Sequence, residues 1–289
     1  MTAIIFGANG QDGHYLTALL QQQNCKVIGV SRNNNYHQIS ITDFDAVQQL
    51  IAEIQPDYIF HLAANSTTRH DALFENHATI STGTLNILEA VKNVSTHTKV
   101  FISGSGLQFQ NEDRPIKESD AFEARDAYSV SRIHSVYAAR YYRSLGLKTY
   151  VGYFFNHDSP RRSERHMAKK ITEFASRIAA GSDEQLVIGD ISVIKEWTYA
   201  GDVVEGIWTL VQQDDIFEAN IASGLGYSIE DWLKVCFDLI GKDWKQYVQV
   251  KDNFKAEYRQ LVADPSLIFS LGFKPEVSFA QLAQMMLRS

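Results

Sequence analysis

Three glycines close to the N-terminus have the spacing of a phosphate-binding turn. They belong to the segment Gly7-Ala8-Asn9-Gly10-Gln11-Asp12-Gly13, which follows the apolar run Ala3–Phe6. Glycine lets backbone N–H groups approach a pyrophosphate closely, and a helix that starts there adds partial positive charge. The segment therefore predicts a dinucleotide site, with an ordinary glycine-rich turn as the alternative. The residues expected to contact the cofactor here are Gly7, Asn9, Gly10, Gln11, Asp12 and Gly13.

The elements around this turn are those that such a site needs. Apolar residues recur at helical spacing after Gly13, and Lys26–Ser31 has the pattern of a second buried strand, so that strand, turn, helix and strand form a β-α-β unit. At the end of the second strand, NAD-dependent enzymes usually carry a carboxylate that holds the ribose 2′-hydroxyl. This chain has Arg32 followed by Asn33, which suits a 2′-phosphate instead. We therefore expect NADP, with NAD as the alternative if Arg32 is only a surface residue.

Strand and helix signals continue to alternate along the chain. Helices are expected at 44–53, 82–91, 127–142, 168–179, 197–211 and 228–240, and strands at 58–62, 99–103, 148–155, 186–189 and 217–222. This alternation predicts an α/β fold with a doubly wound parallel sheet of the Rossmann type. Ligands bind at the carboxyl edge of such a sheet. We therefore expect four further residues at strand ends to line the cofactor site: Leu62, Ala63, Ala64 and Ser103.

The pattern changes after the strand at 148–155, which indicates two parts. We expect a Rossmann domain over residues 1–155, to which residues 193–222 return, and a smaller, mostly helical substrate-binding lobe over residues 156–192 and 223–289.

Composition disfavours several other classes of protein. The chain has 289 residues, a net charge of −7 and two cysteines, Cys25 and Cys236, that form no CxxC pair. This charge gives no support to nucleic-acid binding, no apolar run has the length of a bilayer span, and the cysteines indicate neither disulfides nor a metal site. We expect a cytoplasmic enzyme without nucleic-acid, membrane or metal partners. One basic cluster fits a small phosphorylated ligand, with a solvated helix face as the alternative: Arg161, Arg162, Arg165, Lys169 and Lys170.

Three segments together resemble extended short-chain dehydrogenases/reductases of the GDP-mannose 4,6-dehydratase group. Phe155-Asn156-His157-Asp158-Ser159-Pro160-Arg161-Arg162 resembles the FNHESPRR loop of that group. Gly10-Gln11-Asp12-Gly13, followed by Tyr15-Leu16, is similar to its GQDGSYL, and Lys195-Glu196-Trp197 is similar to its RDW. The resemblance spans nearly the whole chain.

The resemblance implies roles for residues of the second lobe. His157 and Arg162 would help to hold the cofactor, and Asn156, Lys170 and Lys195 would face the diphosphate of a nucleotide sugar. The RPTEV segment of the family is present as residues 254–258 without its arginine, so Lys255 or Arg259 would have to replace that phosphate contact. The resemblance also implies a homodimer or a homotetramer.

The same resemblance assigns the reacting groups. Tyr128 would exchange a proton with the reacting oxygen of the sugar, and Ser105 would hydrogen-bond that oxygen. Arg132 stands where the family has the lysine that holds the nicotinamide ribose and supplies positive charge to the tyrosine. Arginine keeps this charge but is planar and larger, so the substitution is not conservative.

A further departure bears on the type of reaction. Two residues after Ser105, dehydratases of the group carry a glutamate that moves a proton from C5 to the departing C6 hydroxyl, and this chain has Leu107. Loss of such a group typically costs ~10²- to 10⁴-fold in rate. We therefore expect an NADP-dependent reductase of a nucleotide-linked 4-keto-6-deoxy sugar, with GDP as the preferred nucleotide. The alternatives are a dehydratase or epimerase in which Glu112, Asp113 or His134 acts as the base, and a cofactor-binding protein without turnover.

Overall fold

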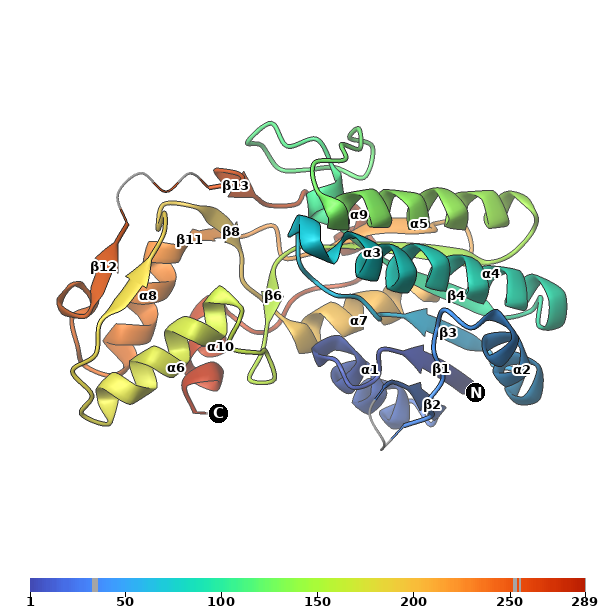
Figure 1. Ribbon diagram of the computed structural model, residues 1–289, viewed down its shortest axis with the longest axis horizontal. Helices are drawn as coiled ribbons and strands as arrows, with labels where there is room; N and C mark the ends of the chain where they lie inside the picture. The colour runs from blue at the N-terminus through green and yellow to red at the C-terminus, as the bar shows by residue number, and fades with distance from the viewer. Residues whose placement is uncertain (33–35, 252–253, 255, 289) are drawn as a thin grey trace.

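A six-stranded parallel sheet forms the centre of the larger part of the molecule (Figure 1). The computed structural model describes residues 1–32, 36–251, 254 and 256–288. The strand order is β10-β5-β4-β3-β1-β2, with β1 (Thr2–Phe6), β2 (Lys26–Val30), β3 (Tyr58–His61), β4 (Lys99–Ser105), β5 (Thr149–Phe154) and β10 (Glu218–Ile221). The inner strands are buried almost throughout, as their apolar sequences require when helices cover both faces. The predicted Rossmann-type sheet is confirmed.

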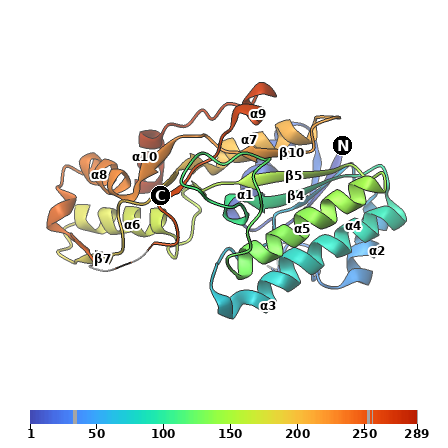
Figure 2. The same cartoon turned by 90° about the horizontal axis from the view of Figure 1, so that it is seen from above.

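Helices cover both faces of this sheet. One face carries α1 (Gln11–Gln22) and α7 (Ala200–Val211), which pack against each other. The other carries α2 (Phe44–Ile54), α4 (Gly83–Val94) and α5 (Ala127–Ser144), which lie side by side in Figure 2. A short helix, α3 (Leu73–Asn76), and a π-helical stretch, His77–Thr82, precede α4. Because α5 packs along β4 and the turn after it, the first turn of α5 lies near the carboxyl edge of the sheet.

The second lobe has its own core of three helices and short strands (Figure 1). The helices are α6 (Met167–Ala179), α8 (Ile229–Leu239) and α10 (Phe279–Leu287). β8 (Ile194–Glu196) pairs with both β11 (Gly226–Ser228) and β13 (Gln260–Leu261), β7 (Leu186–Ile188) pairs with β12 (Val248–Val250), and β6 (His157–Asp158) pairs with β9 (Thr198–Tyr199). Trp197 and Trp232 stack in this core with ring centroids 4.5 Å apart.

The chain returns to the main sheet later than expected. α7 and β10 rejoin the sheet, but β8 belongs to the small sheet of the second lobe, and the helix predicted from residue 197 begins at Ala200. α9 (Ser266–Ser270) packs against β10 and α7, whereas its neighbours in sequence, α8 and α10, pack in the core of the second lobe. Among the described residues, no helix is long and apolar enough to cross a membrane, and no group of side chains has the composition of a metal site.

Candidate active site

The glycine-rich turn opens onto a cavity at the carboxyl ends of β1, β2 and β3. This cavity of about 780 Å³ is lined by Gly7, Asn9, Gly10, Arg32, Leu62, Ala63 and Ala64, among others. Gly7 has a φ of +92°, and a Cβ added to it would lie 2.7 Å from the backbone nitrogen of Ala63. A Cβ added to Gly13 would lie 2.7 Å from the Cα of Ala8. Only glycine at these positions lets the turn, the start of α1 and the loop after β3 approach so closely, which is the geometry of a phosphate cradle.

Two arginines from different lobes lie at this cavity. The Arg32 side chain is 93% exposed, and its Nη1 lies 3.9 Å from Glu75 Oε1, so the guanidinium remains accessible to a phosphate. Arg165, a member of the basic cluster, also lines the cavity. Asn33, predicted to lie beside Arg32, falls outside the described residues.

His157 joins the second lobe to the first turn of α1. Its Nε2 lies 3.0 Å from Asp12 Oδ1, and its Nδ1 lies 2.7 Å from the carbonyl oxygen of Phe155. Burial acts to raise the pKa of Asp12, but the neighbouring His157 and Arg162 outweigh it and bring this pKa to about 2. Burial acts to lower the pKa of His157, and the Asp12 carboxylate outweighs it, so this pKa is raised. Each partner therefore favours the charged form of the other.

Other contacts hold the same loop against α1. Ser159 Oγ donates a hydrogen bond to Gln11 Oε1 at 2.8 Å, and within the loop itself Arg162 Nε lies 3.2 Å from Asp158 Oδ1. The loop predicted from the family resemblance thus packs on the glycine-rich turn, where Gln11 and Asp12 were expected to contact the cofactor. In this structure, however, Gln11 and Asp12 contact the loop through their side chains.

The predicted reacting residues surround a second cavity, of about 190 Å³, that adjoins the first at Leu62. Ser105 comes from the end of β4, whereas Tyr128 and Arg132 lie one turn apart on α5. The other lining residues include Ser103, Leu107, Asn156, His157, Arg162 and Leu261. The structure therefore brings residues from 103 to 162 together at the carboxyl edge of the sheet.

Arg132 turns its guanidinium inward rather than toward solvent. Only 3% of the residue is exposed. Its Nη1 donates to the carbonyl oxygen of Ser103 and, at 2.7 Å, to Ser103 Oγ, while its Cζ lies 4.9 Å from the ring centroid of Tyr128. Ser103 Oγ in turn donates to the carbonyl oxygen of His61 at 2.9 Å. No carboxylate pairs with Arg132 among the described residues, so its positive charge acts on the Tyr128 ring and on the cavity.

Ser105 begins a tight turn that also places Leu107. Ser105 Oγ accepts from the backbone nitrogen of Leu107 at 3.2 Å, and Ser105 N donates to Gln108 Oε1 at 2.9 Å. Within the described part of the chain the hydroxyl proton of Ser105 has no acceptor, so it can be donated to a ligand. The side chain of Leu107 lines the same cavity and brings no titratable group to it.

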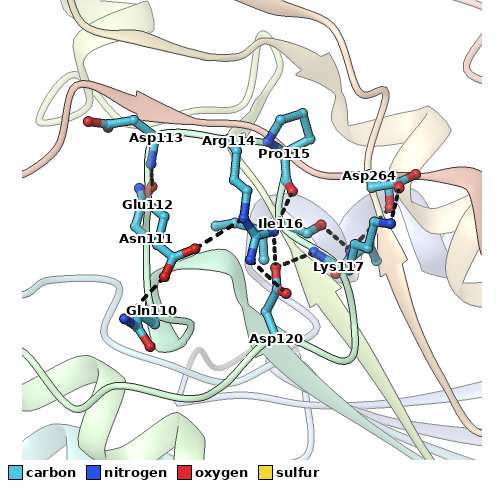
Figure 3. Close-up of polar contacts among 11 residues, drawn as sticks. Gln110, Asn111, Glu112, Asp113, Arg114, Pro115, Ile116, Lys117, Asp120 and Asp264 are labelled. Carbon is cyan, nitrogen blue, oxygen red and sulfur yellow. Dashed lines mark hydrogen bonds and ion pairs between the residues drawn. The ribbon is translucent and has the colours of Figure 1, made fainter.

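None of the three bases considered for a relocated proton transfer lines this cavity. Figure 3 shows Glu112 turned toward Arg114, whose Nε lies 3.1 Å from Glu112 Oε2, and shows Asp113 pointing away from the other labelled side chains. Arg114 also pairs with Asp120 at 2.9 Å, which holds this loop together at the surface. His134 packs against His77 with ring centroids 6.0 Å apart.

The residues expected to bind the diphosphate differ in their placement. Asn156 lines the cavity, and its Oδ1 is buried without a hydrogen-bond partner in the described structure. Lys195 is buried on β8 with its Nζ 4.4 Å from the ring centroid of Trp197, and burial lowers its pKa although Asp158 acts in the opposite direction. Lys170 and Arg259 are exposed. Lys255, the other candidate for the missing family arginine, lies outside the described residues.

Glu196, next to Lys195, was not predicted to have a role. Its carboxylate is fully buried and accepts from the backbone nitrogens of Ala263 at 2.8 Å, Ser223 at 2.7 Å and Gly224 at 3.2 Å. Burial raises the pKa of this carboxyl, while the backbone donors act to lower it. These bonds fix β8, and with it Lys195, to two segments of the chain. A carboxylate directly before Trp197, in a short segment with large apolar residues, was the sequence signal that could have indicated a buried role for Glu196.

Further lining residues were missed, among them Ser66, Thr67, Thr68 and His166. Ser66 and Thr67 lie in the loop after β3, which ends at His61, so hydroxyl groups in a loop at the carboxyl edge of the sheet could have indicated them. Burial and the nearby Arg162 lower the pKa of His166 to about 4, so this imidazole is neutral at physiological pH.

Comparisons with known proteins agree with this arrangement. The sequence profile of the GDP-mannose 4,6 dehydratase family matches residues 4–286. GDP-mannose 4,6 dehydratase 2 of Arabidopsis thaliana is 31% identical over 98% of this chain and 85% of the relative, and GDP-mannose 4,6-dehydratase of Vibrio cholerae serotype O1 is 28% identical over 99% and 92%.

Solved structures share the fold at lower identity. UDP-glucose 4-epimerase of Thermotoga maritima with UDP-glucose superposes with a TM-score of 0.88 at 22% identity over 100% of this chain and 98% of that chain. RMD of Pseudomonas aeruginosa complexed with NADPH gives a TM-score of 0.87 at 21% identity over 99% and 96%. With the family profile matched almost from end to end, the chain belongs to the GDP-mannose 4,6-dehydratase family of nucleotide-sugar-modifying short-chain dehydrogenases/reductases.

Proposed function

We propose that this protein is an NADPH-dependent reductase of a nucleotide-linked 4-keto-6-deoxy sugar, with GDP as the preferred nucleotide. The observation that carries the proposal is that Leu107, two residues after Ser105, lines the cavity. Asp12 is the one carboxylate among the described lining residues, and it is paired with His157. Elimination of water needs a group that takes the proton from C5 and gives it to the departing C6 hydroxyl, whereas reduction of a ketone needs only a hydride and one proton donor.

The residues present fit a dinucleotide cofactor. The Gly7 cradle would receive its pyrophosphate, since backbone there approaches too closely for any Cβ. Arg32 would hold a 2′-phosphate, which favours NADPH over NADH. When bound, the cofactor supplies the hydride. The NADPH complex of the structurally similar RMD supports this choice.

Each reacting side chain would then have one task. Tyr128 would give a proton to the C4 oxygen of the sugar, and the Arg132 guanidinium, 4.9 Å from the Tyr128 ring, would stabilise the negative charge left on the phenol. The hydroxyl of Ser105 would hydrogen-bond the same oxygen. Asn156 Oδ1, buried without a partner in the described structure, would accept a hydrogen bond from the substrate, and Lys195 would attract the diphosphate.

The proposal is tested by mixing the protein with NADPH and a GDP-linked 4-keto-6-deoxy sugar and following NADPH absorbance. We expect oxidation that depends on the keto sugar and is lost in Tyr128→Phe. In a second reaction, GDP-mannose with NADP⁺ should remain unchanged. Formation of a 4-keto product from GDP-mannose would instead show that the protein is a dehydratase despite Leu107.

A second candidate is favoured by the contacts of Arg132. Its Nη1 is already bonded to Ser103, so this nitrogen is not free to donate to ribose hydroxyls as the lysine of the family would. A cofactor-binding protein without turnover would bind NADPH but oxidise none of it with any keto sugar. If the wild type has no turnover, Arg132→Lys would create activity. If the protein is the proposed reductase, the wild type already has measurable activity before this substitution.

We also propose a homodimer or homotetramer located in the cytoplasm. α5 exposes Val130, Tyr137 and Tyr141, at 44%, 58% and 60%, along one of its sides, which is apolar surface that a second copy would cover. We further propose that the chain divides into a Rossmann domain, which includes α7 and β10, and a substrate-binding lobe. The net charge of −7 continues to argue against a nucleic-acid partner.

A further inference from the structure

The cavity around Ser105 and Tyr128 has two chemically different sides. Leu107 and Leu261 line it on one side, and both also line a neighbouring cavity of about 260 Å³. Ser66 and Thr67 line it as well, and both also line a different neighbouring cavity, of about 640 Å³. The two neighbouring cavities share no lining residue. The leucines and the hydroxyl groups therefore lie on separate sides of the central cavity.

On the leucine side, Leu107 and Leu261 offer only hydrocarbon surface to a ligand. Leu261 is 4% exposed on β13, and Leu107 packs with the core cluster of the main sheet. Two acidic residues of the cavity beyond them are engaged in other contacts. Asp126 caps α5 by accepting from Tyr128 N at 2.8 Å, and Glu257 accepts from Thr68 Oγ1 at 3.2 Å.

A 4-keto-6-deoxy sugar has the same asymmetry around its carbonyl group. On one side of C4, the carbon C5 carries a methyl group, C6, and on the other side C3 carries a hydroxyl. We propose that Leu107 and Leu261 form a subsite that recognises the C6 methyl group, while Ser66 and Thr67 face the ring hydroxyls. This inference rests on the proposed function, because the C4 oxygen must lie between Ser105 and Tyr128.

The subsite gives a measurable preference. A hydroxyl on C6 would be buried against the two leucines with no hydrogen-bond partner. Pockets of this kind disfavour an added hydroxyl by about 10²-fold. Leu107 and Leu261 are thus specificity-determining residues that select a sugar already deoxygenated at C6.

Equilibrium binding tests this inference without turnover. GDP-6-deoxymannose and GDP-mannose, which differ only in the C6 hydroxyl, are titrated by calorimetry into the protein saturated with NADPH, which cannot reduce either sugar. The wild type should bind the 6-deoxy compound about 10²-fold more tightly. Leu107→Ser should reduce this ratio to about 10-fold or less, because its hydroxyl can pair with that of C6.

Two variants serve as controls for the substitution. Leu107→Met keeps an apolar side chain of similar volume and should preserve the ratio. Leu225→Ser changes a leucine that is 60% exposed and lies outside this cavity, and should also preserve it. Binding of NADPH by each variant shows that it is folded.

The outcomes separate the subsite from the reaction. Equal binding of both sugars by the wild type, or an unchanged ratio in folded Leu107→Ser, overturns the methyl subsite and leaves the reductase proposal intact. If the protein strongly prefers the 6-deoxy compound but no keto sugar causes NADPH oxidation, the methyl subsite is supported and the reductase proposal is overturned. If neither sugar binds while NADPH does, both are wrong.

Discussion

Glu218 on β10 joins the sheet to the helix that carries Tyr128. Its Oε2 lies 2.6 Å from Arg140 Nη2 and 2.6 Å from the Tyr153 hydroxyl, and its Oε1 lies 2.9 Å from Arg143 Nη1. The Glu218 side chain is 15% exposed. Burial acts to raise the pKa of Glu218, but its hydrogen bonds to Arg140, Tyr153 and Arg143 outweigh it and bring the pKa from 4.5 to about 2. We predict that Glu218→Gln destabilises the protein in a pH-dependent manner.

The size of the effect follows from these two pKa values. The difference between 4.5 and about 2 corresponds to about 3 kcal/mol of stability at neutral pH, at about 1.4 kcal/mol per pH unit. The folded-state pKa is the lower one, so this contribution is complete well above 4.5 and is lost as the pH falls toward 2. By linkage, about 0.8 kcal/mol of it is lost at pH 4 and about 2 kcal/mol at pH 3.

Urea unfolding of the wild type and Glu218→Gln at several pH values measures this directly. We expect a gap of about 3 kcal/mol at pH 7 that narrows steadily below pH 5. Glu112→Gln is the matched control, because the exposed pair of Glu112 with Arg114 should leave stability nearly unchanged. A gap that is independent of pH would mean that Glu218 acts through packing rather than charge, and a gap near zero would refute the cluster as a stabilising feature.

Three other substitutions probe the cofactor cradle and the second lobe. Gly7→Ala should weaken NADPH binding at least about 10-fold, because both the φ of +92° and the contact with Ala63 exclude a Cβ. Fluorescence titration measures this affinity, and an unchanged value would contradict the prediction. Arg32→Met should weaken NADPH about 10-fold or more and leave NADH unaffected, and equal losses for both would place the arginine away from the 2′-phosphate. Glu196→Gln should lower the unfolding free energy by about 2–4 kcal/mol, because its amide N–H₂ would face backbone donors, and a change under about 0.5 kcal/mol would show that the site rearranges freely.

The main sheet and the cradle could be predicted because their signals are local. The run from Ala3 to Gly13 contains strand, turn and helix start together, and the strands predicted at 58–62 and 99–103 are present as β3 and β4. Capping residues gave helix limits as well: Ser228 and Ser278 both form capping boxes. These features depend on neighbours within a few residues.

Contacts between distant segments could not be predicted in the same way. The family resemblance placed His157 near the cofactor, but its pairing with Asp12, 145 positions away, depends on how two lobes pack. Residues 194–199 were expected to return toward the main sheet, but β8 and β9 pair with strands of the second lobe and the loop after β5, and such short strands have no clear periodicity. Glu196 belongs to the same class, since its partners at 223–224 and 263 are remote in sequence.

In the short turn at Gly106–Gln108, the groups that stabilise the turn differ from the side chain that faces the cavity. Its hydrogen bonds come from the backbone of Leu107 and from the side chains of Ser105 and Gln108, so the side chain at position 107 carries none of them. A substitution there changes the chemistry of the cavity wall and the packing of Leu107 on the core, but removes no hydrogen bond of the turn. Under the proposed function, the difference between removing water and reducing a ketone would thus reside in the side chain at position 107, within a turn whose hydrogen bonds do not depend on that side chain.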